Sequence, residues 1–217
     1  MAIEQKDIAA IREDYSKDSL QEKDVDENPF RQFSLWFEQA LRAAVIEPNA
    51  MTLSTINQAG FPSSRVVLLK DFKSDGFSFF TNYNSQKGQD LEANNKASLL
   101  FFWPELQRQV RIEGFVQRLA EEDSDEYYAS RPRGSQIGAW ASPQSQIIRD
   151  RAFLEKEVQV YEERFGQQKS VPRPDFWGGF FLLPVRFEFW QGRNSRLHDR
   201  IVYQKKGTKW ETNRLAP

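Results

Sequence analysis

The chain has 217 residues, 39% of them hydrophobic, so it is long and apolar enough to build a real core, and no linker divides it into two domains. Its formal net charge of −1 argues against a general nucleic-acid binder, and the absence of cysteine excludes disulfides and thiolate metal sites. The polar first segment has no signal-peptide core, no run of 18 apolar residues could cross a membrane, and the single histidine excludes sites that need two imidazoles. We therefore expect a cytoplasmic protein with no metal site.

The first half of the chain predicts an arm, two helices and several strands. Residues 1–27 show only weak helical periodicity, and we expect a flexible arm ahead of a single domain over 28–217. Apolar residues at helical spacing predict a helix over 30–46, and Ser85 can cap a short helix that ends near Ala93. Alternating stretches bounded by turn residues predict the following strands: 51–56, 64–70, 77–81, 97–103 and 108–119.

The second half predicts two helices and then the final strands. An acidic helix over 121–130 should stop at Arg131-Pro132, because the residue before proline avoids the α region. Ser142-Pro143 should open a second helix that runs to about Phe165. Final strands are predicted over 176–190, 201–204 and 209–214. Many short antiparallel strands with a few helices predict a mainly β, α+β fold, built as a small barrel with peripheral helices.

The densest cationic segment is Arg196-Leu197-His198-Asp199-Arg200. If this segment is a strand, Arg196, His198 and Arg200 share one face, because side chains alternate along a strand. Such a row of positive groups makes sense when an anion lies against it. The alternative is a solvated edge strand whose charges keep it soluble, and the pattern alone leaves both interpretations open.

The chain lacks a Rossmann or P-loop motif, so any phosphate must be bound by side chains. Three more segments could supply such side chains. Strict alternation puts Arg65 and Lys70 on opposite strand faces, where they could serve different anions, although both could also be surface cations. Tyr127 and Arg131 are four residues apart and would share a helical face, although the arginine could simply favour the helix dipole.

The third segment, Ser85-Gln86-Lys87, would place free amides and a lysine at a helix start, although a plain cap explains it equally. Gln109, Gln144 and Ser145 are neutral polar residues that could meet the edge of a heterocycle, although most such residues are only surface polars.

Together these segments resemble the pyridoxamine 5'-phosphate oxidase family over nearly the whole chain. The most specific block is Glu188-Phe189-Trp190-Gln191, followed after four residues by the cationic segment that ends at Arg200. Further similar blocks occur in the same order as in the family: 65–70, 130–133, 135–140 and 176–179. One position departs from the family, which usually has arginine where this chain has Gln86, so one cationic contact to the cofactor phosphate is missing.

The resemblance implies an FMN-binding split barrel that works as a homodimer with FMN at the subunit interface. It implies the following cofactor-binding residues: Arg65, Val66, Leu68, Lys70, Phe80, Thr81, Gln86, Lys87, Gln109, Gln144, Ser145, Trp190 and Arg200. It also implies a substrate-binding set of Arg12, Tyr15, Lys70, Tyr127, Arg131, Ser135, Arg196 and His198. Arg196 and His198 would be the catalytic residues, lying over the substrate ring.

The implied activity is oxidation of pyridoxamine or pyridoxine 5'-phosphate to pyridoxal 5'-phosphate, with oxygen as electron acceptor and hydrogen peroxide as product. One alternative is a flavin reductase on the same barrel, which the substrate-phosphate set argues against. Another is a non-catalytic module that binds FMN or pyridoxal phosphate, which the intact pair of Arg196 and His198 disfavours.

Overall fold

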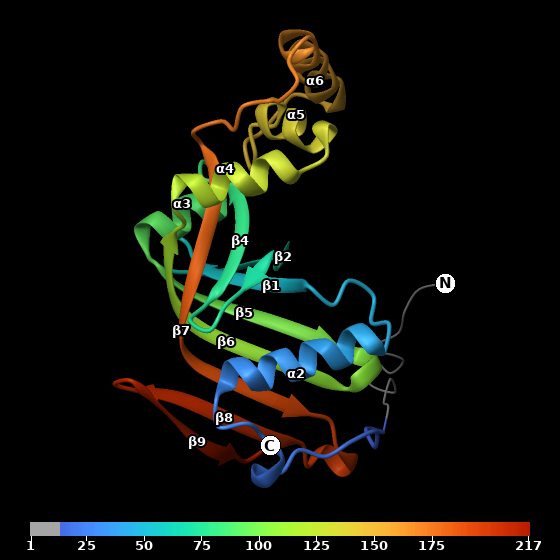
Figure 1. Cartoon of the computed structure of the whole chain (residues 1–217), viewed down its shortest axis with the longest axis vertical. Helices are drawn as coiled ribbons and strands as arrows, with labels where there is room; N and C mark the ends of the chain where they lie inside the picture. Colours follow the sequence, from blue (N-terminus) through green and yellow to red (C-terminus); the bar gives the residue numbers. More distant parts are fainter. Residues whose placement is uncertain (1–13) are drawn as a thin grey trace. The chain divides into compact units, whose positions relative to one another are not determined.

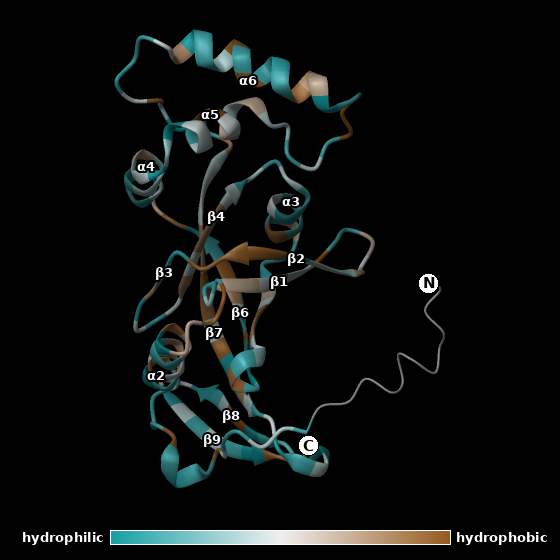
Figure 2. Cartoon of the chain, turned by 90° about the vertical axis from the view of Figure 1, so that its right-hand side faces the viewer, coloured by the Kyte–Doolittle hydropathy of each residue, from teal (hydrophilic) through white to brown (hydrophobic). Residues whose placement is uncertain are grey.

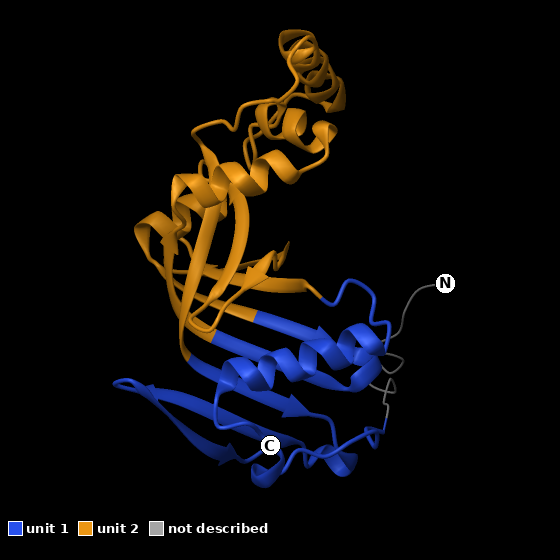
Figure 3. Cartoon of the chain, viewed as in Figure 1, with its two compact units in different colours: residues 1–48, 100–112, 186–217 blue, residues 49–99, 113–185 orange. Residues whose placement is uncertain are grey.

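The computed structural model describes residues 14–217 (Figure 1). Most of the expected N-terminal arm, including Arg12, lies outside the described residues. The described residues divide into two compact units (Figure 3): unit 1 comprises residues 14–48, 100–112 and 186–217, and unit 2 comprises residues 49–99 and 113–185. The single domain expected over 28–217 stays a prediction.

Within the described residues the strands form one nine-stranded sheet, in the order β2-β1-β5-β6-β7-β4-β3, with β8 pairing with β7 and β9 with β8. The strands are β1 (Ala50–Ile56), β2 (Pro62–Leu68), β3 (Asp71–Phe72), β4 (Phe77–Asn82), β5 (Lys96–Trp103), β6 (Arg108–Arg118), β7 (Trp177–Gln191), β8 (Asp199–Lys206) and β9 (Lys209–Leu215). The β1–β2, β4–β7 and β7–β8 pairs are antiparallel. With the helices around it, this sheet confirms the predicted α+β class.

Unit 1 has its core between α2 (Pro29–Arg42) and the strands beneath it (Figure 1). The helix buries an aromatic stripe, in which Phe33 lies 5.1 Å from Phe101 and Trp36 lies 5.3 Å from Phe189 between ring centres. The prediction that this helix continues to residue 46 is wrong. Ala44 adopts φ 52°, and Val45 N donates to Ala40 O, which closes the helix as a Schellman motif.

Unit 2 carries the remaining α-helices that the structure describes: α3 (Gln86–Ala93), α4 (Glu121–Ser130), α5 (Arg133–Ala141) and α6 (Arg151–Phe165). The predictions for α3 and α4 are confirmed, and Ser85 caps α3 by accepting from Gly88 N. The prediction of one helix from Ser142 to Phe165 is wrong. Helix α5 lies before this range, residues 142–150 are irregular, and α6 begins after Asp150, which accepts from Phe153 N as its N-cap.

Helices α5 and α6 pack together around a small cluster of their own, formed by Ile137, Phe165 and Val171. Figure 2 shows α6 as largely hydrophilic, in keeping with Phe165 being the one buried residue of this helix. The irregular segment before α6 is therefore held by a helix pair that has its own apolar support.

No helix of the described residues is long and apolar enough to span a membrane. The same residues contain no group of three or more His, Cys, Asp or Glu side chains that could hold a metal ion.

Candidate functional site

A first cationic cluster in unit 2 is built on Arg65 and Lys87. Arg65 lies on β2, and its guanidinium donates to Thr55 Oγ1 at 2.8 Å and to Ser63 Oγ at 2.7 Å. Its Nη2 also lies 3.6 Å from the carboxylate of Asp90, which is fully buried. The orientation of Arg65 is therefore fixed by its own unit.

Lys87 lies in the first turn of α3, and its ammonium donates to Thr81 Oγ1 at 3.1 Å and to Gln144 Oε1 at 3.0 Å. Burial, and then the positive charge of Arg65, lower the pKa of Lys87 to about 8. Two cations held this close disfavour each other's charge, and an anion between them would relieve that cost. This cluster suits a phosphate group.

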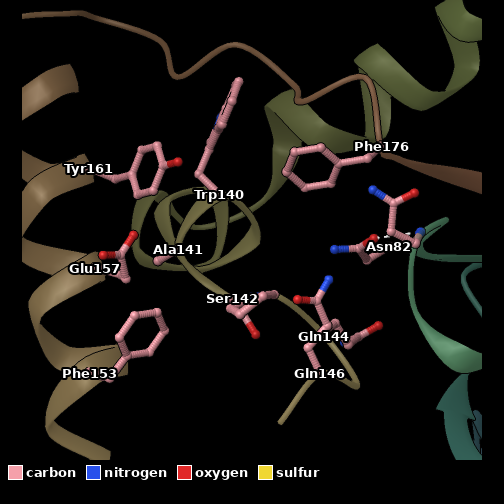
Figure 4. Close-up of a pocket in the computed structure, with 12 residues that line it drawn as sticks. Asn82, Trp140, Ala141, Ser142, Gln144, Gln146, Phe153, Glu157, Tyr161 and Phe176 are labelled. Atoms are coloured by element: carbon pink, nitrogen blue, oxygen red, sulfur yellow. Dashed lines mark hydrogen bonds between the residues drawn. The ribbon is translucent and has the colours of Figure 1, made fainter. Parts of the chain in front are cut away.

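The irregular segment that precedes α6 brings Gln144 into this cluster. A cavity of about 290 Å³ lies beside Gln144, between α5 and α6 (Figure 4). The neighbouring Ser145 is exposed and has φ 69°, a left-handed backbone that serine rarely adopts. The tight turn at Ser145 follows directly on the residue that reaches Lys87.

The other predicted cofactor residues of unit 2 lie near the same strands. Gln86 Nε2 donates to Asp90 Oδ1 at 2.7 Å, so its amide is engaged with the carboxylate that also lies beside Arg65. Val66 and Leu68 lie on β2, where Val66 is 68% exposed and thus free to meet a ligand. Phe80 lies on β4 and stacks on Tyr127 at 3.9 Å between ring centres.

A second cluster in unit 2 surrounds Arg131. Its guanidinium lies 4.5 Å from the ring centre of Trp177, and its Nη1 atom is buried without a hydrogen-bond partner among the described residues. Lys70 Nζ lies 5.9 Å from the ring of Tyr127, which runs nearly parallel to the ring of Trp177. Ser135 is exposed on α5. Because an unsatisfied buried N–H is costly, Arg131 suits an anionic ligand.

Two predictions about the residues of this second cluster are wrong: the shared helical face of Tyr127 and Arg131, and the strand alternation that relates Lys70 to Arg65. Helix α4 ends at Ser130, and Arg131 is its C-cap in an extended conformation, so Tyr127 and Arg131 do not share a helical face. Strand β2 ends at Leu68, and Lys70 N donates to Ser78 O, so strict alternation does not relate Lys70 to Arg65.

A third cluster belongs to unit 1 and contains the only histidine. The ring of His198 lies 4.6 Å from Trp190 and 5.9 Å from Tyr15 between centres. Arg193 N donates to His198 Nδ1 at 3.1 Å. Burial, and then the charge of Arg196, lower the pKa of His198. Because Nδ1 accepts a hydrogen bond, the neutral form of this imidazole carries its proton on Nε2.

The prediction that Arg196, His198 and Arg200 share one face of a strand is wrong, because β8 begins only at Asp199. Residues 194–196 form a short 3-10 turn, in which Ser195 and Arg196 have φ values of 56° and 58°. Left-handed residues interrupt the alternation on which the prediction depended.

The remaining predicted cofactor residues also lie in unit 1. Arg200 lies on β8 directly opposite Trp190 on β7, and Gln109 lies half-buried on β6. The predicted set thus falls into one group in each unit.

Sequence reasoning gave no role to two buried carboxylates behind the cationic residues. Asp90 lies 3.6 Å from Arg65, and Glu188 lies 2.9 Å from Arg200. Both are at most 1% exposed. The signal for Glu188 was its place between Phe187 and Phe189 in a largely apolar strand, because a buried carboxylate needs a cationic partner.

Comparison with solved structures defines the class of this fold. The structure superposes with a TM-score of 0.85 on PhzG from Burkholderia lata in complex with tetrahydrophenazine-1-carboxylic acid, at 31% identity, covering 92% of this chain and 98% of that chain. It matches a pyridoxamine 5'-phosphate oxidase-related, FMN-binding protein from Nostoc punctiforme with a TM-score of 0.69 at 15% identity, covering 87% and 98%. The fold is the predicted antiparallel split barrel.

Sequence comparison identifies the family within this class. A family model described as pyridoxamine 5'-phosphate oxidase matches residues 37–165, and one described as pyridoxine 5'-phosphate oxidase C-terminal dimerisation region matches residues 177–217. The chain is 56% identical to pyridoxine/pyridoxamine 5'-phosphate oxidase 1 of Ralstonia nicotianae over 97% of this chain and 99% of that protein. It is 53% identical to the pyridoxine/pyridoxamine 5'-phosphate oxidase of Trichormus variabilis over 97% and 98%. The chain belongs to the pyridoxamine 5'-phosphate oxidase family.

Proposed function

We propose that this protein is an FMN-dependent oxidase that converts pyridoxamine or pyridoxine 5'-phosphate to pyridoxal 5'-phosphate, with oxygen as electron acceptor and hydrogen peroxide as product. The observation that carries the proposal is the pair of cationic clusters in unit 2, around Lys87 and around Arg131. Cofactor and substrate each carry one phosphate, and the chain offers a separate cluster for each. Two relatives named pyridoxine/pyridoxamine 5'-phosphate oxidase, at 53% and 56% identity, support the assignment.

The first cluster fits the phosphate of FMN. Arg65 offers the positive charge of a guanidinium whose terminal nitrogens are held by Leu53 O, Thr55 Oγ1 and Ser63 Oγ. Lys87 offers an ammonium whose charge is favoured once a phosphate lies beside it. Thr81 and Gln144, which already contact Lys87, add neutral polar groups. When bound, FMN supplies the two-electron acceptor for the oxidation.

The cofactor residues of unit 1 fit a site completed by a second copy of the chain. The match to a C-terminal dimerisation region supports a homodimer. In this proposal Gln109, Trp190 and Arg200 of one protomer contact the FMN whose phosphate is bound by unit 2 of the other protomer.

The second cluster fits the phosphate of the substrate. Arg131 has a buried N–H group to offer, and Lys70, Tyr127 and Ser135 contribute further polar atoms. Arg196 and His198 would hold the substrate ring so that the reacting carbon is well placed. In the resting protein His198 would act as a hydrogen-bond donor through Nε2, because Nδ1 already accepts from Arg193 N.

Tyr15 lies against Trp190 and His198, in keeping with a role in closing the site. The same role expected for Arg12 stays a prediction outside the described residues. The cytoplasmic location also stays a prediction.

The decisive experiment adds pyridoxamine 5'-phosphate in air to the protein reconstituted with FMN. We expect a yellow protein that forms aldehyde and hydrogen peroxide in equal amounts. Unphosphorylated pyridoxamine at the same concentration is the matched control and should react far more slowly, since it cannot use Arg131. A colourless protein that refuses FMN would contradict the proposal. So would oxidation of a reduced nicotinamide or of tetrahydrophenazine-1-carboxylic acid without turnover of pyridoxamine phosphate.

A further inference from the structure

Glu188 lies at the centre of a group of three arginines in unit 1. Its Oε1 accepts from Arg200 Nε at 2.9 Å, and Arg200 Nη2 lies 2.9 Å from the same oxygen. Its Oε2 accepts from Arg186 Nη2 at 2.9 Å and lies 3.7 Å from Arg111 Nη1. The side chain of Glu188 is 1% exposed. A single buried carboxylate therefore contacts three guanidinium groups.

The place of Glu188 on β7 shows that this carboxylate does not belong to the apolar core. Phe187 and Phe189, on either side of it, are fully buried and pack against rings of α2. Side chains alternate along a strand, so Glu188 points to the opposite face, together with Trp190. Arg200 is the direct cross-strand neighbour of Trp190 and lies on this same face.

The contacts of Arg200 fix the direction of its guanidinium. Nε is engaged with Glu188, and Nη1 donates to Ala216 O at 2.8 Å. Each terminal nitrogen carries two N–H groups, so Nη1 and Nη2 each retain one for a ligand. A guanidinium held at its Nε edge presents its terminal nitrogens in a set orientation. Without Glu188, the long side chain of Arg200 would sample several rotamers.

We propose that Glu188 is a positioning residue for cofactor binding, acting through Arg200. This inference rests on the proposed function, in which Arg200 contacts FMN. The carboxylate fixes the guanidinium before the cofactor arrives, so that less conformational freedom is lost on binding. Arg186 and Arg111 hold the other oxygen and keep the carboxylate itself in place.

The test measures the dissociation constant of FMN by quenching of flavin fluorescence on titration into apo-protein. The Glu188→Gln variant keeps the shape and one acceptor oxygen but removes the charge. We expect its dissociation constant to rise about tenfold, the range expected when a charge-assisted hydrogen bond becomes a neutral one. The matched control is Glu211→Gln, an exposed carboxylate on β9 of the same unit, which should leave the dissociation constant unchanged.

A double-mutant cycle separates positioning from a general loss of structure. In an Arg200→Lys background, which lacks the planar guanidinium but keeps a positive charge, Glu188→Gln should change the dissociation constant less than about twofold. If Glu188→Gln raised the dissociation constant tenfold in both backgrounds, the proposal would be overturned, because Glu188 would then act independently of Arg200. Thermal unfolding of each apo-protein reports whether the variant is still folded. The visible circular dichroism of bound flavin should change in Glu188→Gln, because it reports on the surroundings of the flavin.

The outcomes also distinguish this inference from the proposed function. If Arg200→Lys weakens FMN binding and Glu188→Gln does not, positioning by Glu188 is wrong while the cofactor site stands. If neither variant affects FMN binding although the wild-type protein oxidises pyridoxamine phosphate, the positioning proposal fails and the activity stands. If the wild-type protein binds no FMN, both fail.

Discussion

The lowered pKa of Lys87 predicts that FMN affinity falls as pH rises through about 8. A phosphate needs the protonated ammonium, which is present below that pKa and lost above it. With a pKa near 8, roughly nine-tenths of the free protein carries the charge at pH 7 and about one-tenth at pH 9. The phosphate itself is already dianionic in this range, because its second pKa is near 6. The affinity should therefore fall about tenfold between pH 7 and pH 9, or about 1.4 kcal/mol.

The assay is titration of apo-protein with FMN at pH 7, 8 and 9 at constant ionic strength. Lys87→Arg keeps a charge throughout this range, so its pH step should disappear. Lys87→Met should bind weakly and without a step. Lys169→Met, which removes an exposed lysine outside the cluster, should retain the step of the wild type. An FMN affinity of the wild type that does not change from pH 7 to pH 9 would show that Lys87 does not control binding in this range. An equal fall in affinity in Lys87→Arg would show that another group is responsible.

Arg131→Lys should raise KM for pyridoxamine phosphate about tenfold to a hundredfold, because lysine cannot make a bidentate contact with the phosphate. In steady-state assays at saturating FMN, kcat should be nearly unchanged. An unchanged KM would exclude Arg131 as a ligand of the substrate phosphate. Because burial and the charge of Arg196 lower the pKa of His198, kcat/KM should stay level through neutral pH and fall only in acid buffer, where the imidazole gains its proton. An acid limb that persists in His198→Asn would belong to another group. Gly88→Ala should cost about 2 kcal/mol or more of unfolding free energy in urea titrations, since a Cβ there would lie 2.1 Å from Tyr83 O, whereas Gly134→Ala meets nothing within 4 Å and should not destabilise.

Local sequence signals predicted those parts of the fold that depend on local interactions. Helix α4 spans Glu121–Ser130 as expected, because three acidic residues favour its first turn and Pro132 prevents its continuation. The cap at Ser85 and the hairpin of β1 with β2 were also predictable, since hydroxyl capping and a glycine turn are local chemistry.

The parts that failed depend on contacts far along the chain or on rare backbone angles. The proline rule predicts only that a helix stops before Pro132, but the fixed φ of proline also suits a helix start, and α5 begins at the next residue. Residues 142–150 leave the helical path where Gln144 reaches Lys87, a contact 57 residues away in sequence. Ser195 and Arg196 have left-handed backbone angles although neither is a glycine, so no sequence signal indicated that the strand alternation breaks there.

For the site, the sequence predicted which residue types would gather but not how they are held. Arg65, Thr81, Lys87 and Gln144 come from four separate segments, and the structure brings Thr81 and Gln144 onto Lys87. Of the carboxylates that orient Arg65 and Arg200, Glu188 stands out in the sequence only by its two phenylalanine neighbours, and Asp90 does not stand out at all. The partner of a buried carboxylate is known only once the chain is folded.

The ring-held guanidinium of Arg131 has a consequence for selectivity. Arg200 has the buried carboxylate of Glu188 beside it, which it shares with Arg186 and Arg111. The positive charge of Arg131 instead rests on the face of Trp177. An unphosphorylated vitamer entering this site would leave that charge desolvated and unmatched. If Arg131 binds the substrate phosphate as proposed, the site should reject unphosphorylated analogues. Raising the salt concentration should then weaken substrate binding more than it weakens the proposed contact of Arg200 with FMN.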